Sequence, residues 1–246
     1  SGIQAILNVA KCKTPINIRD IGFAIAPRIN AAGRIDDAKK IVELLTSGNL
    51  AIEKELSNAI SIENEYRREL DQEITQEALS IIYSSDDFDQ KKSTVIFKAH
   101  WHKGVIGIVA SRLQEKVYKP TIVLTESNGL ITGSARSVKG FNIHDAISSC
   151  SHLLESFGGH AFAAGLTLKS ENLAEFTRQF EAHCVIIDND NFTPEISIDC
   201  PIEFNEMNDR FFRVLWQFEP FGIDNLAPVF SSDNIVCFPD IKVMTG

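Results

Sequence analysis

Apolar residues between positions 36 and 80 recur at helical spacing in two successive runs. The first run covers residues 36–45, and Gly48 follows it as a stop signal, so we expect a short helix there. Asn49 is a favourable cap for the second run, which continues for roughly 32 residues, or about 48 Å at the rise of an α-helix. Its apolar stripe comprises Ile52, Leu56, Ala59, Ile60, Leu70, Ile74 and Ala78. We expect this long helix to join two modules, with Glu63 and Arg67 paired on its exposed side.

Beyond a polar break at residues 84–90, the pattern changes to short strands that alternate with helices. It predicts strands at residues 93–98, 120–125, 130–135 and 165–168, and helices at 104–118, 143–149 and 172–184. This order predicts an α/β domain of about 100 residues. The polar residues 188–193 mark its boundary. Beyond them we expect a β-leaning module, with strands at 196–199, 229 and 235–236, a helix at 211–216 and a turn at 220–222.

The composition is that of a globular protein, because 246 residues with 44% hydrophobic content can form one large or two modest domains. The five cysteines show no C-x-x-C spacing, so neither a disulfide framework nor a cysteine zinc site is indicated, and a reducing cytoplasm fits best. No apolar run approaches about 18 residues and no signal sequence is visible, so we expect no membrane association. The Ser1-Gly2 start without an initiator Met, and an end inside a strand-like stretch, suggest an excised piece.

The net charge of −9 argues at first against a nucleic-acid partner, because affinity for phosphates depends on Lys and Arg. The charge is unevenly distributed, however. Residues 91–142 contain nine Lys or Arg and two Glu, which gives this segment +7 and leaves −16 for the rest of the chain. Such a local excess of positive charge is typical of a nucleic-acid-binding surface.

Four short clusters combine cationic or hydrogen-bonding side chains with small residues. In the first, P-R-I-N-A-A-G-R, Arg28, Asn30 and Arg34 flank small residues that let a ligand approach. Arginine suits phosphate because its planar fork donates two parallel hydrogen bonds. The alternative is a loop whose arginines pair with Asp36 and Asp37.

The second cluster places His102 and Lys103 just before the helix expected from Gly104. The start of a helix directs unpaired N–H groups at an anion, so we expect an anion-binding role here. His100 and His102 could instead be metal ligands, but no third ligand with suitable spacing lies near them.

The third and fourth clusters are Ser134, Arg136 and Ser137, and Gly158, Gly159 and His160. Alternate residues of a strand share a face, so Ser134 and Arg136 can reach one ligand together. In the fourth cluster, paired glycines permit a backbone whose following N–H groups form an anion-binding concavity, and His160 would add a donor. The alternative is a tight turn with a packed histidine.

Taken in order, these clusters resemble the RecJ exonucleases of the DHH phosphoesterase superfamily. The resemblance runs from about Ile21 to Phe230. It is carried by P-R-I-N-A-A-G-R-I-D-D-A, W-H-K-G-V-I-G-I-V-A-S-R-L, G-S-A-R-S, F-G-G-H-A-F-A-A-G and F-E-P-F-G-I-D-N-L-A-P-V-F. Residues 223–226 depart from the family, which more often has small or acidic residues and a proline there.

The resemblance implies an α/β architecture in four parts. Residues 1–47 would be the end of a DHH domain, 48–84 the connecting helix, 85–187 the DHH-associated substrate-binding domain, and 188–246 the start of a β-rich oligonucleotide-binding barrel module. Family members hold Mn²⁺ or Mg²⁺ between aspartates and histidines of the DHH domain. The chain has no Asp-His-His triplet and no D-x-D before Asp36, so we expect no catalytic residue, no bound metal and no activity in this fragment alone.

The resemblance further implies a 5′-to-3′ exonuclease of single-stranded DNA that acts in DNA repair and recombination. The 5′-terminal phosphate is expected at Arg34, with Arg28 as its rival, and at Ser134 and Arg136. The backbone near the scissile phosphate is expected at Gly158, Gly159 and His160, and further nucleic-acid contacts at Asn30, His102, Lys103 and Ser137. Besides single-stranded DNA, a single-strand-binding protein or a helicase is an expected partner of the full-length protein.

Two other functions stay open. A DHH-family phosphoesterase that degrades short oligonucleotides or cyclic dinucleotides uses the same associated domain, but such compact relatives are expected to stop near Cys184. A non-catalytic nucleic-acid-binding module, like the one appended to alanyl-tRNA synthetases, has no need of the P-R-I-N-A-A-G-R segment. A D-x-D and a D-H-H upstream of Ser1 would favour the exonuclease.

Overall fold

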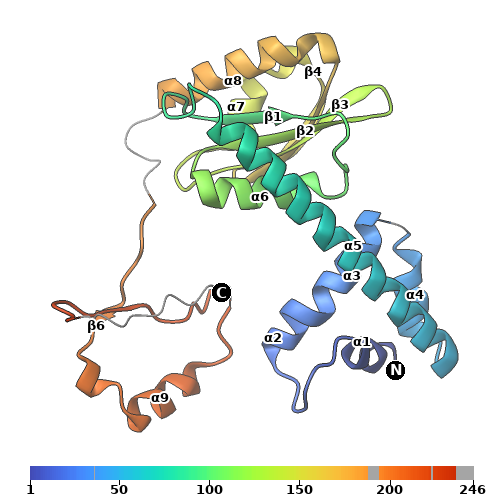
Figure 1. Cartoon of the computed structure of the whole chain (residues 1–246), viewed down its shortest axis with the longest axis vertical. Coiled ribbons are helices and arrows are strands. Elements are labelled where there is room, and N and C mark those ends of the chain that lie inside the picture. The colour runs from blue at the N-terminus through green and yellow to red at the C-terminus, as the bar shows by residue number, and fades with distance from the viewer. Residues whose placement is uncertain (36, 188–193, 223, 237–246) are drawn as a thin grey trace. The chain divides into compact units, whose positions relative to one another are not determined.

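Figure 1 shows a computed structural model of the chain, which describes residues 1–35, 37–187, 194–222 and 224–236. The chain divides into two compact units, Ser1–Thr193 and Pro194–Gly246. The first contains a long helix with a helical group at one end and an α/β sheet domain at the other (Figure 1). The second contains short helices and strands.

Short helices precede the long one: α1 (Gly2–Val9), α2 (Ile18–Asp20), η1 (Ile21–Ile25), α3 (Ala26–Ile35) and α4 (Lys39–Thr46). Their apolar residues form a core around the buried Ile60 of the long helix. The helix expected at residues 36–45 corresponds to α4, and Asp36 lies outside the described residues. Residues 27–34 belong to α3, so the loop considered for them is wrong. α2, η1 and α3 follow one another without a break, so Pro27 lies inside a continuous helix, directly after the π-helical turn η1.

The predicted long helix is α5 (Leu50–Tyr83), which has 34 residues. It begins at the Asn49 cap, whose side chain accepts a hydrogen bond from the Ala51 N–H at 2.9 Å. Its first half packs against the N-terminal helices, and its second half packs through Ile74 and Ala78 against the sheet domain. A single helix therefore contributes to two apolar cores.

The polar side of α5 is more buried than its pattern predicts. The Glu63 side chain is 13% exposed, and its carboxylate pairs with Lys40 of α4 at 2.9 Å. Arg67 instead donates a hydrogen bond to Asn64 Oδ1 at 2.8 Å. The predicted Glu63–Arg67 pair is therefore wrong, because α4 supplies a closer cation.

The sheet domain contains β1 (Thr94–Phe97), β2 (Thr121–Ser127), β3 (Leu130–Arg136), β4 (Leu154–His160) and β5 (Ala163–Leu168). Their order in the sheet is β1-β2-β3-β5-β4. β1 and β2 are parallel, and the other neighbours are antiparallel, so the sheet is mixed. The strands expected at residues 93–98, 120–125, 130–135 and 165–168 are observed, whereas the apolar pattern predicts no strand at β4.

Different helices cover the two faces of this sheet (Figure 1). α7 (Ile143–Ser149) and α8 (Leu173–Ile187), with the short turns η2 (Ser151–Leu153) and η3 (Ser170–Asn172), lie on one face, where Phe176 and Phe180 are fully buried. On the other face, α6 (Ile106–Val117) and the end of α5 pack over Val123 of β2. α6 also contacts β3, but the same face of β5 and β4 stays exposed at Gly165 and Gly158. One face of the sheet is therefore only half covered.

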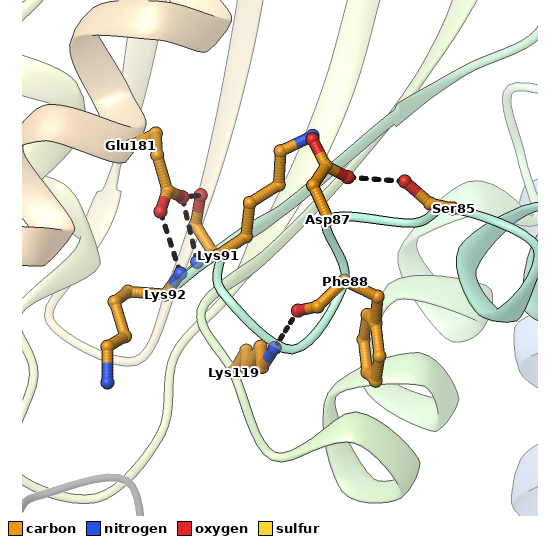
Figure 2. Close-up of polar contacts among 8 residues, drawn as sticks. Ser85, Asp87, Phe88, Lys91, Lys92, Lys119 and Glu181 are labelled. Atoms are coloured by element: carbon orange, nitrogen blue, oxygen red, sulfur yellow. Dashed lines mark hydrogen bonds and ion pairs between the residues drawn. The ribbon is translucent and has the colours of Figure 1, made fainter.

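Figure 2 shows how the loop between α5 and β1 is held in place. Glu181 of α8 accepts hydrogen bonds from the Lys92 N–H at 2.7 Å and the Ser93 N–H at 2.9 Å, and from the Ser93 hydroxyl. Lys119, just before β2, donates to the Phe88 carbonyl and lies 4.0 Å from the centre of the Phe88 ring. The Glu181 bonds attach the start of the first strand to the last helix of the domain, and the Lys119 contacts attach the loop to the segment before β2.

The second unit contains β6 (Cys200–Pro201), η4 (Phe204–Glu206), α9 (Asp209–Leu215), η5 (Trp216–Phe218) and β7 (Phe230–Ser231). α9 corresponds to the helix expected at residues 211–216. The strand expected at residues 196–199 begins later than predicted, as β6, although the Asp199 N–H already donates to the Val229 carbonyl at 2.9 Å. No strand forms at residues 235–236. Across the described ranges, no helix combines the length and the apolar character needed to cross a membrane.

Candidate nucleic-acid-binding site

A groove of about 600 Å³ opens where the end of α3, the segment before α6, the first turn of α6 and β3 meet. It is lined by Gly33, Arg34, His102, Lys103, Gly104, Ile106, Gly107, Thr132, Gly133, Ser134 and Arg136. The predicted site residues among them are Arg34, His102, Lys103, Ser134 and Arg136, from three separate sequence clusters. None of the described residues that line the groove is acidic, so it offers cations and hydrogen-bond donors to an anion.

Neighbouring hydroxyl groups hold the guanidinium of Arg136 at the end of β3. Nε donates to Ser111 Oγ at 2.9 Å, and Nη1 donates to Ser134 Oγ at 2.8 Å. Nη2 makes neither bond and lies beside Gly107, where an added Cβ would come within 3.3 Å of it. Burial, followed by the charge of Arg34, lowers the pKa of Arg136. The guanidinium of Arg136 stays protonated despite this lowered pKa, so a bound anion would stabilise a cation that is partly buried and lies near a second positive charge.

Two glycines allow α3, α6 and β3 to approach one another. A Cβ at Gly104 would lie 2.1 Å from the Arg34 carbonyl oxygen. Arg34 in turn donates from Nη1 to the Gly104 carbonyl at 3.3 Å. At Gly107, a Cβ would lie 3.2 Å from Ser134 Oγ. The lack of a side chain at Gly104 lets the segment before α6 lie against the Arg34 backbone, and its lack at Gly107 lets α6 lie close to Ser134.

The segment before α6 presents an oriented imidazole. His102 Nδ1 accepts a hydrogen bond from the Gly104 N–H at 3.1 Å, so in the neutral ring Nε2 carries the proton and can donate to an anion. Glu77 of α5 anchors the same segment, because it accepts a hydrogen bond from Trp101 Nε1 at 2.7 Å and lies 3.1 Å from His100 Nε2. The bond from Trp101 is the main cause of the lowered pKa of Glu77.

Gly158, Gly159 and His160 lie in β4, where they pair with β5. The tight turn considered for this cluster follows them directly, at Ala161 and Phe162 between β4 and β5, but His160 is exposed and not packed. The Phe162 N–H donates to His160 Nδ1 at 3.3 Å, and the anion-binding role stays a prediction. Gly159 has φ 150°, and a Cβ there would lie 2.3 Å from the Ala163 carbonyl oxygen. Close strand pairing at an unusual backbone angle explains the glycine at 159.

His160 nevertheless shares a sheet face with Arg136. Arg136 pairs with Ala163 of β5, which pairs with His160 of β4, so the three side chains stand on one face. Two strand spacings of about 4.8 Å separate Arg136 from His160 by about 10 Å. Gly158 and Gly165 lie on this face and are exposed, so no bulky side chain obstructs it. The groove therefore adjoins a flat, accessible surface.

Three further predicted residues do not line the groove. Arg28 donates from Nε to Ser61 Oγ at 3.2 Å, which braces α3 against α5. The hydroxyl of Ser137 donates to backbone carbonyls in the turn after β3. Asn30 is exposed on α3, one helical turn before Arg34 and on the same side of the helix.

Six residues that line the groove were not among the predicted site residues: Gly33, Gly104, Ile106, Gly107, Thr132 and Gly133. Thr132 precedes Ser134 by two residues in β3, so the alternation of strand faces could have identified it. Gly107 lies within W-H-K-G-V-I-G, but only the packing of α6 on β3 gives it a role.

The donors in the groove do not suit a divalent cation, because guanidinium, ammonium and imidazole N–H groups attract anions. Within residues 1–35, 37–187, 194–222 and 224–236, no three His, Cys, Asp or Glu side chains gather in a way that could hold a metal ion. The groove can bind and orient an anionic ligand.

Residues 70–185 match the family model of the DHHA1 domain. The chain is 35% identical to the single-stranded-DNA-specific exonuclease RecJ of Bacillus subtilis over 223 residues, which cover 89% of this chain and 28% of that protein. It is 32% identical to RecJ of Escherichia coli over 241 residues, which cover 93% of this chain and 41% of that protein. The crystal structure of RecJ from Thermus thermophilus in complex with Mg²⁺ matches with a TM-score of 0.83 and 27% identity, over 93% of this chain and 35% of that one.

The chain thus carries a DHHA1 domain and belongs to the DHH/DHHA1 family. Within that family it is a partial homologue of RecJ. It spans between 28% and 41% of the length of these two curated relatives. The mixed five-stranded sheet is part of the region that it shares with RecJ.

Proposed function

We propose that this chain is the nucleic-acid-binding part of a 5′-to-3′ single-stranded DNA exonuclease that acts in DNA repair and recombination. The supporting observation is the convergence of Arg34, Ser134 and Arg136 on one groove. Their guanidinium and hydroxyl groups would hold the 5′-terminal phosphate, since charge-assisted hydrogen bonds to phosphate are strong and directional. His102 and Lys103, on the same groove, would contact the adjoining part of the strand.

The exposed face of β5 and β4 would take the backbone near the scissile phosphate. Gly158 carries no side chain on that face, the neighbouring Gly159 offers its backbone, and His160 has Nε2 available as a donor because Nδ1 accepts the Phe162 N–H. An extended surface beside a phosphate-binding groove supports a strand as the ligand in preference to a cyclic dinucleotide or a short oligonucleotide.

We assign residues 1–47 to the end of a DHH domain, 48–84 to a connecting helix, 85–187 to the substrate-binding domain and 188–246 to the start of an oligonucleotide-binding module. RecJ has been solved with Mg²⁺ and with Mn²⁺. We place such an ion in the DHH domain of a full-length protein, where it would activate the attacking water. A cytoplasmic location and an association with a single-strand-binding protein or a helicase remain predictions.

Fluorescence anisotropy with labelled single-stranded DNA tests the binding role. Binding should weaken with salt, with a slope of about −0.7 per neutralised phosphate, so an Arg34→Gln/Lys103→Gln double variant should flatten the slope by about 1.4. Lys169→Gln/Arg178→Gln is the matched control, because both cations pair with glutamates away from the groove. Its slope should equal that of the parent chain.

Absence of binding at low salt, or a salt slope unchanged in the double variant, would overturn the proposal. The same mixtures supplemented with Mn²⁺ should release no mononucleotides, since the described residues include no group of His, Cys, Asp or Glu side chains that could hold a metal ion. Metal-dependent release by the purified chain would contradict its proposed inactivity.

A further inference from the structure

Phe162 is a large apolar side chain that stands in the open at the rim of the sheet. It is the second residue of the two-residue turn between β4 and β5, and it is 67% exposed. The other Phe, Tyr and Trp side chains of the described stretch 94–186 are buried or half-buried. Single exposed apolar residues are common on protein surfaces, so only the position and the rigidity of Phe162 can indicate a role.

Backbone hydrogen bonds on both sides hold this turn in place. The Phe162 carbonyl accepts the Ser137 N–H at 3.0 Å, and the Ala161 carbonyl accepts the Ile143 N–H at 3.1 Å. The Phe162 N–H donates to His160 Nδ1 at 3.3 Å. The turn is thereby attached to the end of β3 and to the start of α7. A fixed backbone presents the ring to a ligand at a low entropic cost, because only side-chain torsions remain to be ordered on binding.

The same contacts place Phe162 between the two proposed phosphate positions. Ser137 directly follows Arg136 of the terminal-phosphate groove, and His160 is the residue proposed to lie near the scissile phosphate. The ring centres of Phe162 and His160 are 6.1 Å apart at an interplanar angle of 63°, so the two rings do not stack and most of the phenyl ring stays available. When a 5′ mononucleotide is released, the nucleotide between the terminal and the scissile phosphate is the first of the strand.

We propose that Phe162 stacks on the base of the 5′-terminal nucleotide. This inference rests on the function proposed above, and it adds a base contact to a site that otherwise binds phosphates. Aromatic side chains bind single strands of any sequence in this way, because every base has a π-face. The stacked base fixes the first nucleotide in place, while Arg136 and His160 bind the phosphates on either side of it. The contact is expected with all four bases.

Oligonucleotides that lack one base test the stacking. A 5′-phosphorylated single strand is compared with strands that are abasic at the first, second or third nucleotide, and binding to the 246-residue chain is measured by anisotropy at low salt. Loss of the first base should weaken binding to the parent chain about 5- to 150-fold, the range that base–aromatic stacking provides. Phe162→Leu keeps an apolar side chain but has no π-face. This variant should bind the intact strand less tightly and should no longer distinguish it from the strand without its first base.

Two further variants serve as controls. Phe162→Trp keeps an aromatic ring and should retain the discrimination against the strand without its first base. Tyr83→Leu is the matched control, because Tyr83 is also an exposed aromatic residue, at 60%, but lies at the end of α5 and does not line the groove. It should respond to each abasic strand as the parent chain does.

Thermal unfolding separates a binding role of Phe162 from a structural one. Because the side chain is mostly exposed, Phe162→Leu should leave the melting temperature unchanged. A lower melting temperature, with equal losses of affinity for all strands, would assign Phe162 to the stability of the β4–β5 turn and overturn the inference.

The 5′-phosphate separates this inference from the function on which it rests. If the parent chain and Phe162→Leu both prefer 5′-phosphorylated to 5′-hydroxyl strands but lose the same factor without the first base, Phe162 does not stack on that base and the groove keeps its role. A dependence on Phe162 that appears only at the second or third base would overturn the assignment to the terminal nucleotide. If the parent chain has no 5′-phosphate preference and binds every abasic strand as it binds the intact one, the groove is not the terminal-phosphate site and the role of Phe162 falls with it.

Discussion

Replacing Arg136 by Ala should lower the preference of the chain for 5′-phosphorylated over 5′-hydroxyl single strands. Nε and Nη1 of Arg136 are already committed to Ser111 and Ser134, which leaves Nη2 for the ligand. One hydrogen bond between a charged donor and a phosphate contributes about 1.5 to 3 kcal/mol, or roughly a 10- to 150-fold preference. Arg136→Lys should restore only part of it, since an ammonium cannot bond both hydroxyls and the phosphate with the geometry of the guanidinium fork.

The assay compares the dissociation constants of otherwise identical 5′-phosphate and 5′-hydroxyl oligonucleotides, with thermal unfolding measured in parallel. Arg178→Ala serves as the control, because Arg178 pairs with Glu175 on α8 and should not affect either constant. If a folded Arg136→Ala protein keeps the parental preference, Arg136 does not contact the terminal phosphate. Equal losses on both oligonucleotides, with a lower melting temperature, would assign Arg136 to the stability of β3.

Two further predictions concern residues around the site and at the edge of the domain. Gly107→Ala should weaken binding of the 5′-phosphate, because the new methyl would lie 3.2 Å from Ser134 Oγ and 3.3 Å from Arg136 Nη2 and would displace both side chains. A variant that binds the 5′-phosphate as the parent chain does would contradict this steric argument. Glu181→Gln should lower the free energy of unfolding by about 1 to 3 kcal/mol, and with it the melting temperature by about 2 to 4 °C per kcal/mol. DNA binding should be unaffected. An unaltered melting temperature would show that the bonds to Lys92 and Ser93 contribute nothing measurable.

Local periodicity was sufficient to predict α5 and most of the strands, because both the Asn49 cap and the apolar stripe are encoded within the elements themselves. β4 was missed because its glycines are typical of turns, and only pairing with β5, through contacts such as Gly158 with Gly165, makes them a strand. The strand expected at residues 196–199 was placed too early, since the pairing with the segment of β7 begins only at the Asp199 N–H, which donates to the Val229 carbonyl at 2.9 Å.

The candidate site was predictable as separate clusters but not as a single surface. Arg34, His102 and Arg136 each belong to a recognisable motif, whereas their meeting depends on the approach of α3 to Gly104 and of α6 to β3. Arg67 shows the limit most clearly. The i,i+4 spacing within α5 predicts a pair with Glu63, whereas in the structure the Glu63 carboxylate pairs with Lys40 of α4.

The hydrogen bonds that Glu181 accepts from the Lys92 and Ser93 N–H groups hold the first residues of the sheet domain next to its last helix. Helix α8 ends at Ile187, less than two turns beyond Glu181, so the segment from β1 to α8 starts and finishes at nearly the same point. A domain with adjacent ends can be inserted into a surface loop, or moved from one protein to another, without stretching the host. The attachment of β1 to α8 therefore lets this region be transferred with the α6 and β3 side of the groove, whereas the Arg34 side comes from α3 and would have to be supplied by the host protein.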